Sequence, residues 1–154
     1  NFDVIAEFVS IAAIIVFIAQ FIKMGEYSEI NALKRFSDLI TIEQYGRGRF
    51  IKGKPSPEDI QAAGKGLERI EEIINSRGYH VIILEEANVA VTCGLFSVQE
   101  LLRIIDNKPD DLELVITGRN AMPEIIERAD LVTEMKEIKH YYQKGVKARV
   151  GIEK

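Results

Sequence analysis

The feature that most constrains the fold is the alternation of short apolar runs, rich in β-branched residues, with helical patterns. Continuous apolar runs of this kind are typical of strands buried on both faces of a parallel sheet. The predicted strands are 14–21, 38–45, 80–84, 112–117 and 131–135, with a short one at 147–152. Strands that alternate with helices predict right-handed βαβ units, and therefore an α/β, three-layer sandwich with a mainly parallel sheet.

The starts of several helices can be read directly from the sequence. Ser56 followed by Pro57 predicts an N-cap and a first helical residue, and Ser97 with Glu100 three residues later predicts a capping box. A further short helix is predicted to open at Pro123. These signals separate the apolar runs and support their interpretation as strands.

Size and composition limit the class of protein. A chain of 154 residues that is 47% hydrophobic predicts one domain over residues 1–154. A net charge of -4 argues against a nucleic-acid binder. The uncharged run from Phe8 to Ile22 is shorter than the roughly 20 residues of a membrane span, so no membrane partner is expected. The single Cys93 has no partner for a disulfide and predicts a thiol in a reducing cytoplasm.

In parallel α/β sheets the chemistry lies beyond the carboxyl ends of the strands. That rule selects five polar segments, namely 20–24, 45–54, 85–88, 117–120 and 134–140. We expect Lys23, Glu85 and Thr117 to lie along one edge of the sheet.

Two acidic residues follow one of the buried strands. Glu85 and Glu86 come directly after the apolar run at 81–84, where carboxylates can reach a magnesium ion on a triphosphate. Magnesium takes few carboxylates and keeps several waters, so two acids are sufficient. The alternative is that both are solvated acids that cap the strand.

Cationic residues follow three other predicted strands. In Thr117-Gly118-Arg119 the guanidinium suits bidentate contact with phosphate oxygens, and the glycine allows close backbone approach. The alternative is a surface arginine paired with Glu124 or Glu127. Lys23 and Lys139 offer further positive charges at the same predicted edge.

The loop from Gly46 to Lys54 holds four basic residues and no acidic one. Its Gly48-x4-Gly53-Lys54 spacing matches a phosphate-binding loop, but Pro55 stands where a Ser or Thr should bind magnesium, so we reject that interpretation. We predict instead a loop that is poorly ordered without ligand and in which Phe50 lies against a large flat ligand. A basic surface hairpin is the alternative.

The order and spacing of these segments resemble the P-loop type of ATP:corrinoid adenosyltransferases. The specific parts are the block from Thr117-Gly118-Arg119 to Lys139-His140 and the closing Gly145–Glu153. Gln20-Phe21-Ile22-Lys23 and the strand that ends in Glu85-Glu86 match as well, but such segments would fit many α/β domains. The resemblance implies a RecA-like P-loop fold. It also implies that cob(I) attacks the 5′ carbon of ATP, that triphosphate leaves, and that no side chain is needed as a general base.

The resemblance also implies roles for individual residues. The expected ATP-binding residues are Lys23, Thr117, Gly118, Arg119 and Lys139. Glu85 and Glu86 are expected to hold Mg²⁺, and Gly48, Arg49 and Phe50 to contact the corrinoid. A homodimer, a flavoprotein reductant and a cytoplasmic location are implied as well.

The first thirteen residues depart from the family pattern. Where the family has a strand, a glycine-lysine loop and a helix, Asn1–Ala13 contain no Gly, Lys, Arg or Thr. Either that loop is encoded upstream of Asn1, which we expect, or the chain is a relative that has lost ATP chemistry. The corresponding hypotheses are an adenosyltransferase and a non-catalytic module that binds a corrinoid or a nucleotide.

Overall fold

The computed structural model describes residues 13–25, 27–48, 51, 53–149 and 152. Its sheet is all parallel, with the strand order β2-β1-β3-β4. The strands are β1 (Val16–Gln20), β2 (Ile40–Gln44), β3 (Val81–Glu85) and β4 (Glu113–Ile116). They confirm the first four predicted strands and the α/β fold class.

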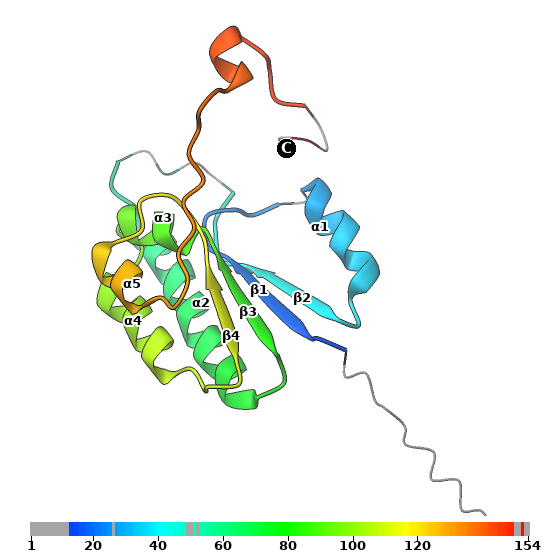
Figure 1. The fold of residues 1–154 in the computed structure, drawn as a ribbon, viewed down its shortest axis with the longest axis vertical. Helices are drawn as coiled ribbons and strands as arrows, with labels where there is room; N and C mark the ends of the chain where they lie inside the picture. The colour runs from blue at the N-terminus through cyan, green and yellow to red at the C-terminus, as the bar shows by residue number, and fades with distance from the viewer. Residues whose placement is uncertain (1–12, 26, 49–50, 52, 150–151, 153–154) are drawn as a thin grey trace, which may run out of the picture.

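Helices follow each strand along the chain, after a loop in the case of β2, and the last helix and turn come after β4 (Figure 1). The helices are α1 (Ser28–Leu33), α2 (Pro57–Ser76), α3 (Ala87–Thr92), α4 (Val98–Asn107) and α5 (Pro123–Arg128), with the 3-10 turns η1 (Lys34–Phe36) and η2 (Tyr141–Lys144). Both predicted N-caps are present as capping boxes, formed by Ser56 with Asp59 and by Ser97 with Glu100. Reciprocal capping fixes where α2 and α4 begin.

The sheet reverses its winding direction at β1. The chain runs from β1 outward to β2, and then passes back across β1 to β3 on its other side. With right-handed crossovers this reversal places α1 and α2 on opposite sides of the sheet, as seen in Figure 1. The carboxyl ends of β1 and β3 therefore flank a topological switch point, where α/β sheets bind their ligands.

One face of the sheet carries the core. Phe17 and Ala19 of β1 and Ile82 and Leu84 of β3 are fully buried, and they alternate with residues that point to the other face. The helices that cover them contribute further fully or nearly fully buried residues: Ala63, Ile70, Ala90, Leu101 and Ile104. This packing makes the strand ends a rigid platform.

The other face of the sheet is covered less completely. Val16, Ile18, Val81 and Ile83 are only half-buried, and Val115 is 42% exposed. Among the described residues, α1 is the helix on this side, and none of its residues is buried. The second helical layer of the predicted sandwich is therefore thin, because a helix of six residues cannot cover a sheet of this width.

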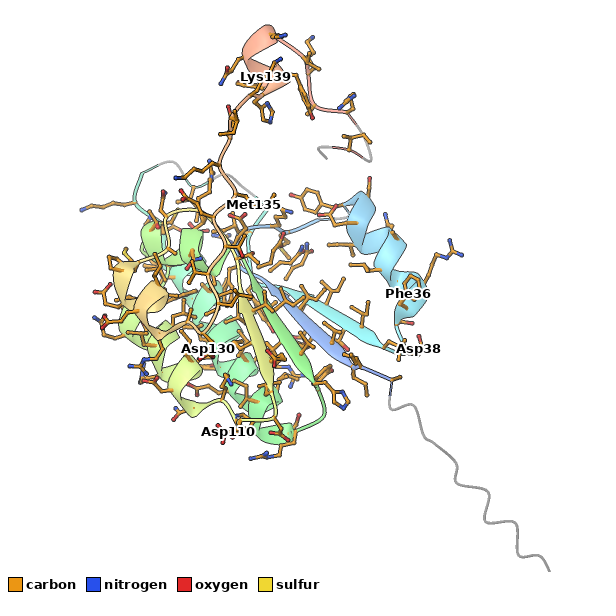
Figure 2. All side chains as sticks on the ribbon, in the orientation of Figure 1. Phe36, Asp38, Asp110, Asp130, Met135 and Lys139 are labelled. Atoms are coloured by element: carbon orange, nitrogen blue, oxygen red, sulfur yellow. The ribbon has the colours of Figure 1, made fainter. Side chains whose placement is uncertain are left out.

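The predicted strand at 131–135 is wrong. These residues form no strand and are exposed, with Leu131 at 85% and Met135 at 95%. Figure 2 shows Met135 in an extended segment that leaves the domain. A strand needs a hydrogen-bonding partner as well as apolar residues, and β4 pairs only with β3 within the described part of the chain. The described residues of 147–152 likewise lie in no strand.

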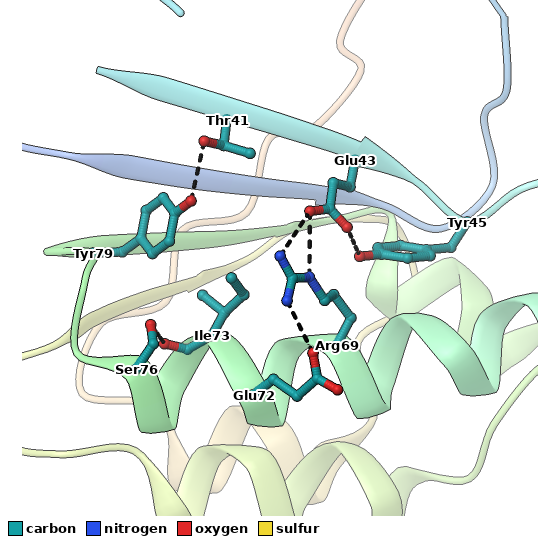
Figure 3. A network of polar contacts seen from close by, with 8 residues as sticks. All are labelled: Thr41, Glu43, Tyr45, Arg69, Glu72, Ile73, Ser76 and Tyr79. Atoms are coloured by element: carbon teal, nitrogen blue, oxygen red, sulfur yellow. Dashed lines mark hydrogen bonds and ion pairs between the residues drawn. The ribbon is translucent and has the colours of Figure 1, made fainter. Parts of the chain in front are cut away.

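A polar network ties the edge strand β2 to α2 (Figure 3). Glu43 accepts a hydrogen bond from the Tyr45 hydroxyl at 2.6 Å and forms an ion pair with Arg69 at 3.4 Å. The Tyr79 hydroxyl donates to Thr41 at 3.1 Å. The bond to Glu43 holds the side chain of Tyr45, the residue that follows β2 and begins the loop to α2.

Candidate functional site

An ion pair spans the switch point between β1 and β3. Lys23 Nζ lies 3.0 Å from Glu85 Oε1 and 3.4 Å from Glu29 Oε1. Partial burial lowers the pKa of Lys23, but the hydrogen bonds and negative charges of Glu85 and Glu29 outweigh burial and hold the pKa above its ordinary value. Lys23 is therefore a cation held at the strand ends by carboxylates.

Glu85 keeps one carboxylate oxygen free. Its Oε2 is buried and has no hydrogen-bond partner, while Oε1 is engaged by Lys23. Glu86 beside it is half-buried and adopts the left-handed conformation, with φ of 61°. No group of three or more His, Cys, Asp or Glu side chains lies together within the described ranges. Mg²⁺ that is bound with a nucleotide usually takes only one or two carboxylates from the protein, and phosphates and waters supply its other ligands. Glu85 Oε2 and the Glu86 carboxylate fit that requirement.

The end of β4 is joined directly to the turn after β3. The Glu86 backbone N–H donates to Thr117 Oγ1 at 3.1 Å, and the Asn88 N–H donates to the Thr117 carbonyl at 3.1 Å. Gly118 has φ of 119°, and a Cβ there would lie 3.1 Å from the Val89 nitrogen. Thr117 and Glu85 therefore share one edge with Lys23, as the sequence predicted.

Arg119 extends from this edge into solvent. It is exposed and makes no hydrogen bond or ion pair with another described residue. The alternative pairing with Glu124 or Glu127 does not form; on α5 it is Arg128 that pairs, with Asp106 of α4. The Arg119 guanidinium is thus available to an anion beside Glu85 and Thr117.

Lys139 is not at this edge. Figure 2 shows it in the extended segment, far from the sheet, and it is exposed. The neighbouring His140 has a structural role, since its Nδ1 accepts a hydrogen bond from the Tyr142 N–H at the start of η2. The prediction for Lys139 depended on a strand at 131–135 that would have carried it to the edge, and that strand does not form.

The sequence analysis assigned no role to two glutamines that meet at the end of the sheet, Gln20 and Gln44. Gln44 Nε2 donates to Gln20 Oε1 at 2.8 Å, and Gln44 Oε1 accepts from the Gly25 N–H at 3.0 Å. Gln20 is 4% exposed. The signal was a glutamine at the end of each of two apolar runs, at positions that pair in register.

The loop after β2 is only partly described, since Arg49 and Phe50 lie outside the described residues. Gly48 has φ of 66°, and a Cβ there would lie 3.1 Å from the Met24 carbonyl oxygen. Arg47 pairs with Glu58 at 3.6 Å and with the buried Asp59 at 3.8 Å. The base of the loop is therefore held both to the segment after β1 and to the start of α2.

Two remaining features bear on the class of protein. Cys93 is a free, half-buried thiol that packs against the core. Within the part of the chain that the structure describes, no helix has the length and apolar character required to traverse a bilayer.

Comparisons with known proteins agree on one family. The family model for the ATP:corrinoid adenosyltransferase BtuR/CobO/CobP matches residues 11–153. A corrinoid adenosyltransferase from Sinorhizobium sp. is 34% identical over 142 residues, which cover 92% of this chain and 65% of the relative. One from Pseudomonas aeruginosa is 30% identical over 137 residues, which cover 88% of this chain and 68% of the relative. One from Escherichia coli K12 is 26% identical over 95 residues, 62% of this chain and 48% of the relative.

The chain thus spans about two thirds or less of the length of these relatives. The family match covers all four strands, the Lys23 and Glu85 ion pair and the segment 117–119. It confirms the resemblance that the motifs indicated. The chain belongs to the ATP:corrinoid adenosyltransferase family.

Proposed function

We propose that the protein transfers the 5′-deoxyadenosyl group of ATP to the cobalt of a reduced corrinoid. The observation that carries the proposal is the grouping of Lys23, Glu85 and Thr117 at the carboxyl edge of the sheet. Two residues after Thr117 stands Arg119, which is exposed and has no partner among the described residues. A cation, carboxylates and a free guanidinium at a switch point are the groups that a metal-bound triphosphate requires. Family membership supports the same reaction.

In the proposed step a cobalt–carbon bond forms as the bond between C5′ and its oxygen breaks. The cobalt of the corrinoid supplies the electron pair and goes from Co(I) to Co(III), and inorganic triphosphate leaves with the pair from the broken bond. No proton moves in this step, so the site needs no general base. The protein contributes by positioning the two substrates and neutralising the leaving group.

The leaving group carries a high negative charge, and the two cations near it differ in availability. Arg119 has no partner to give up among the described residues, whereas Lys23 is paired with Glu85 and Glu29. We assign Arg119 to the triphosphate directly. Lys23 acts mainly by neutralising Glu85. It can contact phosphate only if it gives up its ion pair with Glu85 or Glu29.

Magnesium would neutralise part of the triphosphate charge when it is bound with ATP. Glu85 Oε2 and the carboxylate of Glu86 are the groups that would hold it. Thr117 and Gly118 hold the neighbouring backbone close to this position.

We place the corrinoid over the loop after β2. By family relation Gly48, Arg49 and Phe50 contact the ring, and Phe50 excludes an axial ligand from the lower face of cobalt. The anchoring of Gly48 and Arg47 at the base of this loop supports a fixed starting point for it. We also propose a cytoplasmic homodimer that receives reduced corrinoid from a flavoprotein.

The test is a transfer assay with the protein expressed from its complete gene. Cob(I)alamin, ATP and Mg²⁺ should give adenosylcobalamin, seen by its absorbance and light sensitivity, and one triphosphate per cobalt. Arg119→Ala should raise the KM for ATP, and Arg103→Ala, which removes an exposed arginine of α4, should not. Binding of corrinoid without any adenosylcobalamin would contradict the transferase proposal and indicate a binding module.

A further inference from the structure

Asn88 links the two segments that carry the candidate site residues, the turn after β3 and the end of β4. It is the second residue of α3, 5% exposed, and separated by about thirty residues from the β4 end that it contacts. Its backbone N–H donates to the Thr117 carbonyl at 3.1 Å, and its side-chain Nδ2 donates to the Gly118 carbonyl at 3.4 Å. Asn88 thus holds the two residues that directly precede Arg119.

The backbone around Asn88 is closely constrained on both sides. Gly118 packs so tightly that a Cβ would lie 3.2 Å from the Asn88 Cβ and 3.3 Å from the Glu86 Cα. Glu86 itself has a positive φ, which non-glycine residues adopt at a cost, and its N–H is held by the Thr117 hydroxyl. The turn after β3 and the end of β4 are therefore packed together, so that neither segment can move without displacing the other.

The side chain of Asn88 is also incompletely satisfied. Its Oδ1 is buried and has no hydrogen-bond partner. Buried polar groups are usually hydrogen-bonded, so an unpaired amide oxygen at this position calls for an explanation. A residue that only filled the core at this position would be apolar. Asn88 instead donates a hydrogen bond from its side-chain amide to the Gly118 carbonyl, next to Arg119.

We propose that Asn88 is a positioning residue that acts through Arg119: it fixes the Thr117–Gly118 backbone so that the guanidinium and the carboxylates of Glu85 and Glu86 face the same triphosphate. The proposal rests on the proposed function. Asn88 need not touch the substrate. Its effect should therefore appear in ATP affinity and should depend on whether Arg119 is present.

The experiment is a double-mutant cycle on ATP affinity. Calorimetric titrations with ATP and Mg²⁺ use the protein from its complete gene, as wild type, Asn88→Ala, Arg119→Ala and the double variant. We expect Asn88→Ala to weaken ATP binding about five- to tenfold, the effect of one ordinary hydrogen bond, and to weaken it less than about twofold when Arg119 is already absent. Corrinoid affinity should not change.

Two controls keep structural effects apart. Asn107→Ala removes an exposed asparagine at the end of α4 and should leave ATP affinity unchanged. Asn88→Ser replaces Asn88→Ala if the latter does not fold, because its hydroxyl is too short to reach Gly118. Additive effects in the cycle, or unchanged ATP affinity in a folded Asn88 variant, would overturn the positioning role alone. A wild-type protein that does not bind ATP would overturn the proposed function, and the positioning role with it.

Discussion

The ion pair between Lys23 and Glu85 should stabilise the fold as well as define the site. Its Nζ–Oε1 distance is 3.0 Å, and the two side chains are 36% and 25% exposed. A hydrogen bond to a charged group contributes about 1.5 to 3 kcal/mol when it is well shielded, and an exposed ion pair about 0.2 to 1 kcal/mol. Because Lys23 is more than one third exposed, solvent screening reduces the expected coupling energy to about 1 kcal/mol.

The coupling energy is measured with Lys23→Met, Glu85→Gln and the double variant in urea unfolding at pH 7. The matched control is the Arg77–Asp111 pair at 3.3 Å, whose side chains are 66% and 80% exposed, and its coupling should be clearly smaller. High salt should weaken the control pair more than the Lys23–Glu85 pair.

The same pair makes a pH prediction. The pKa of Lys23 in the folded protein is raised, so its stabilising contribution is complete below the ordinary lysine pKa and is lost as the pH rises through the raised value. The coupling should therefore be constant from pH 6 to 8 and disappear only in strongly alkaline solution. A coupling energy near zero at pH 7, or one equal to that of Arg77–Asp111, would refute this account of the switch point.

Three further predictions concern the scaffold. Gly66→Ala should destabilise the protein by about 1 to 3 kcal/mol in urea unfolding, since a Cβ would lie 2.7 Å from the Tyr45 ring; a neutral change would contradict this packing. Ser97→Ala should lower the free energy of unfolding by about 1 kcal/mol, measured by thermal unfolding. Backbone and side-chain hydrogen bonds with Ser97 lower the pKa of Glu100, so the stabilisation from this cap should be lost as the pH falls through that lowered pKa. Burial, followed by the hydrogen bond to Glu43, raises the pKa of Tyr45, so its ultraviolet titration should lie above that of a free tyrosine and move down in Glu43→Gln.

The sequence correctly predicted the four strands of the sheet. Each of these apolar runs lies beside another strand, with which it forms backbone hydrogen bonds. The run at 131–135 has similar composition, but its pairing depends on what lies beside β4, and composition does not report that. The expected place of Lys139 at the edge of the sheet was missed for the same reason, because it was inferred from the strand before it.

The common edge of Lys23, Glu85 and Thr117 was predictable from the rule that ligands bind at the carboxyl ends of parallel strands. The contacts within the edge were not. The Lys23–Glu85 pair depends on the register that aligns Gln20 with Glu85, and the Asn88 contacts depend on the left-handed turn at Glu86. Neither a register nor a turn of this kind has a local signal in the sequence.

The central claim is that ATP binds at the carboxyl edge, around the switch point between β1 and β3. Hydrogen exchange of the protein expressed from its complete gene, with and without ATP and Mg²⁺, tests it most directly. We expect slower exchange of the amides at 86–88 and 117–119, and no change at 108–112 on the opposite edge. Protection confined to the opposite edge, or no protection at 86–88 and 117–119 at saturating ATP, would contradict the claim.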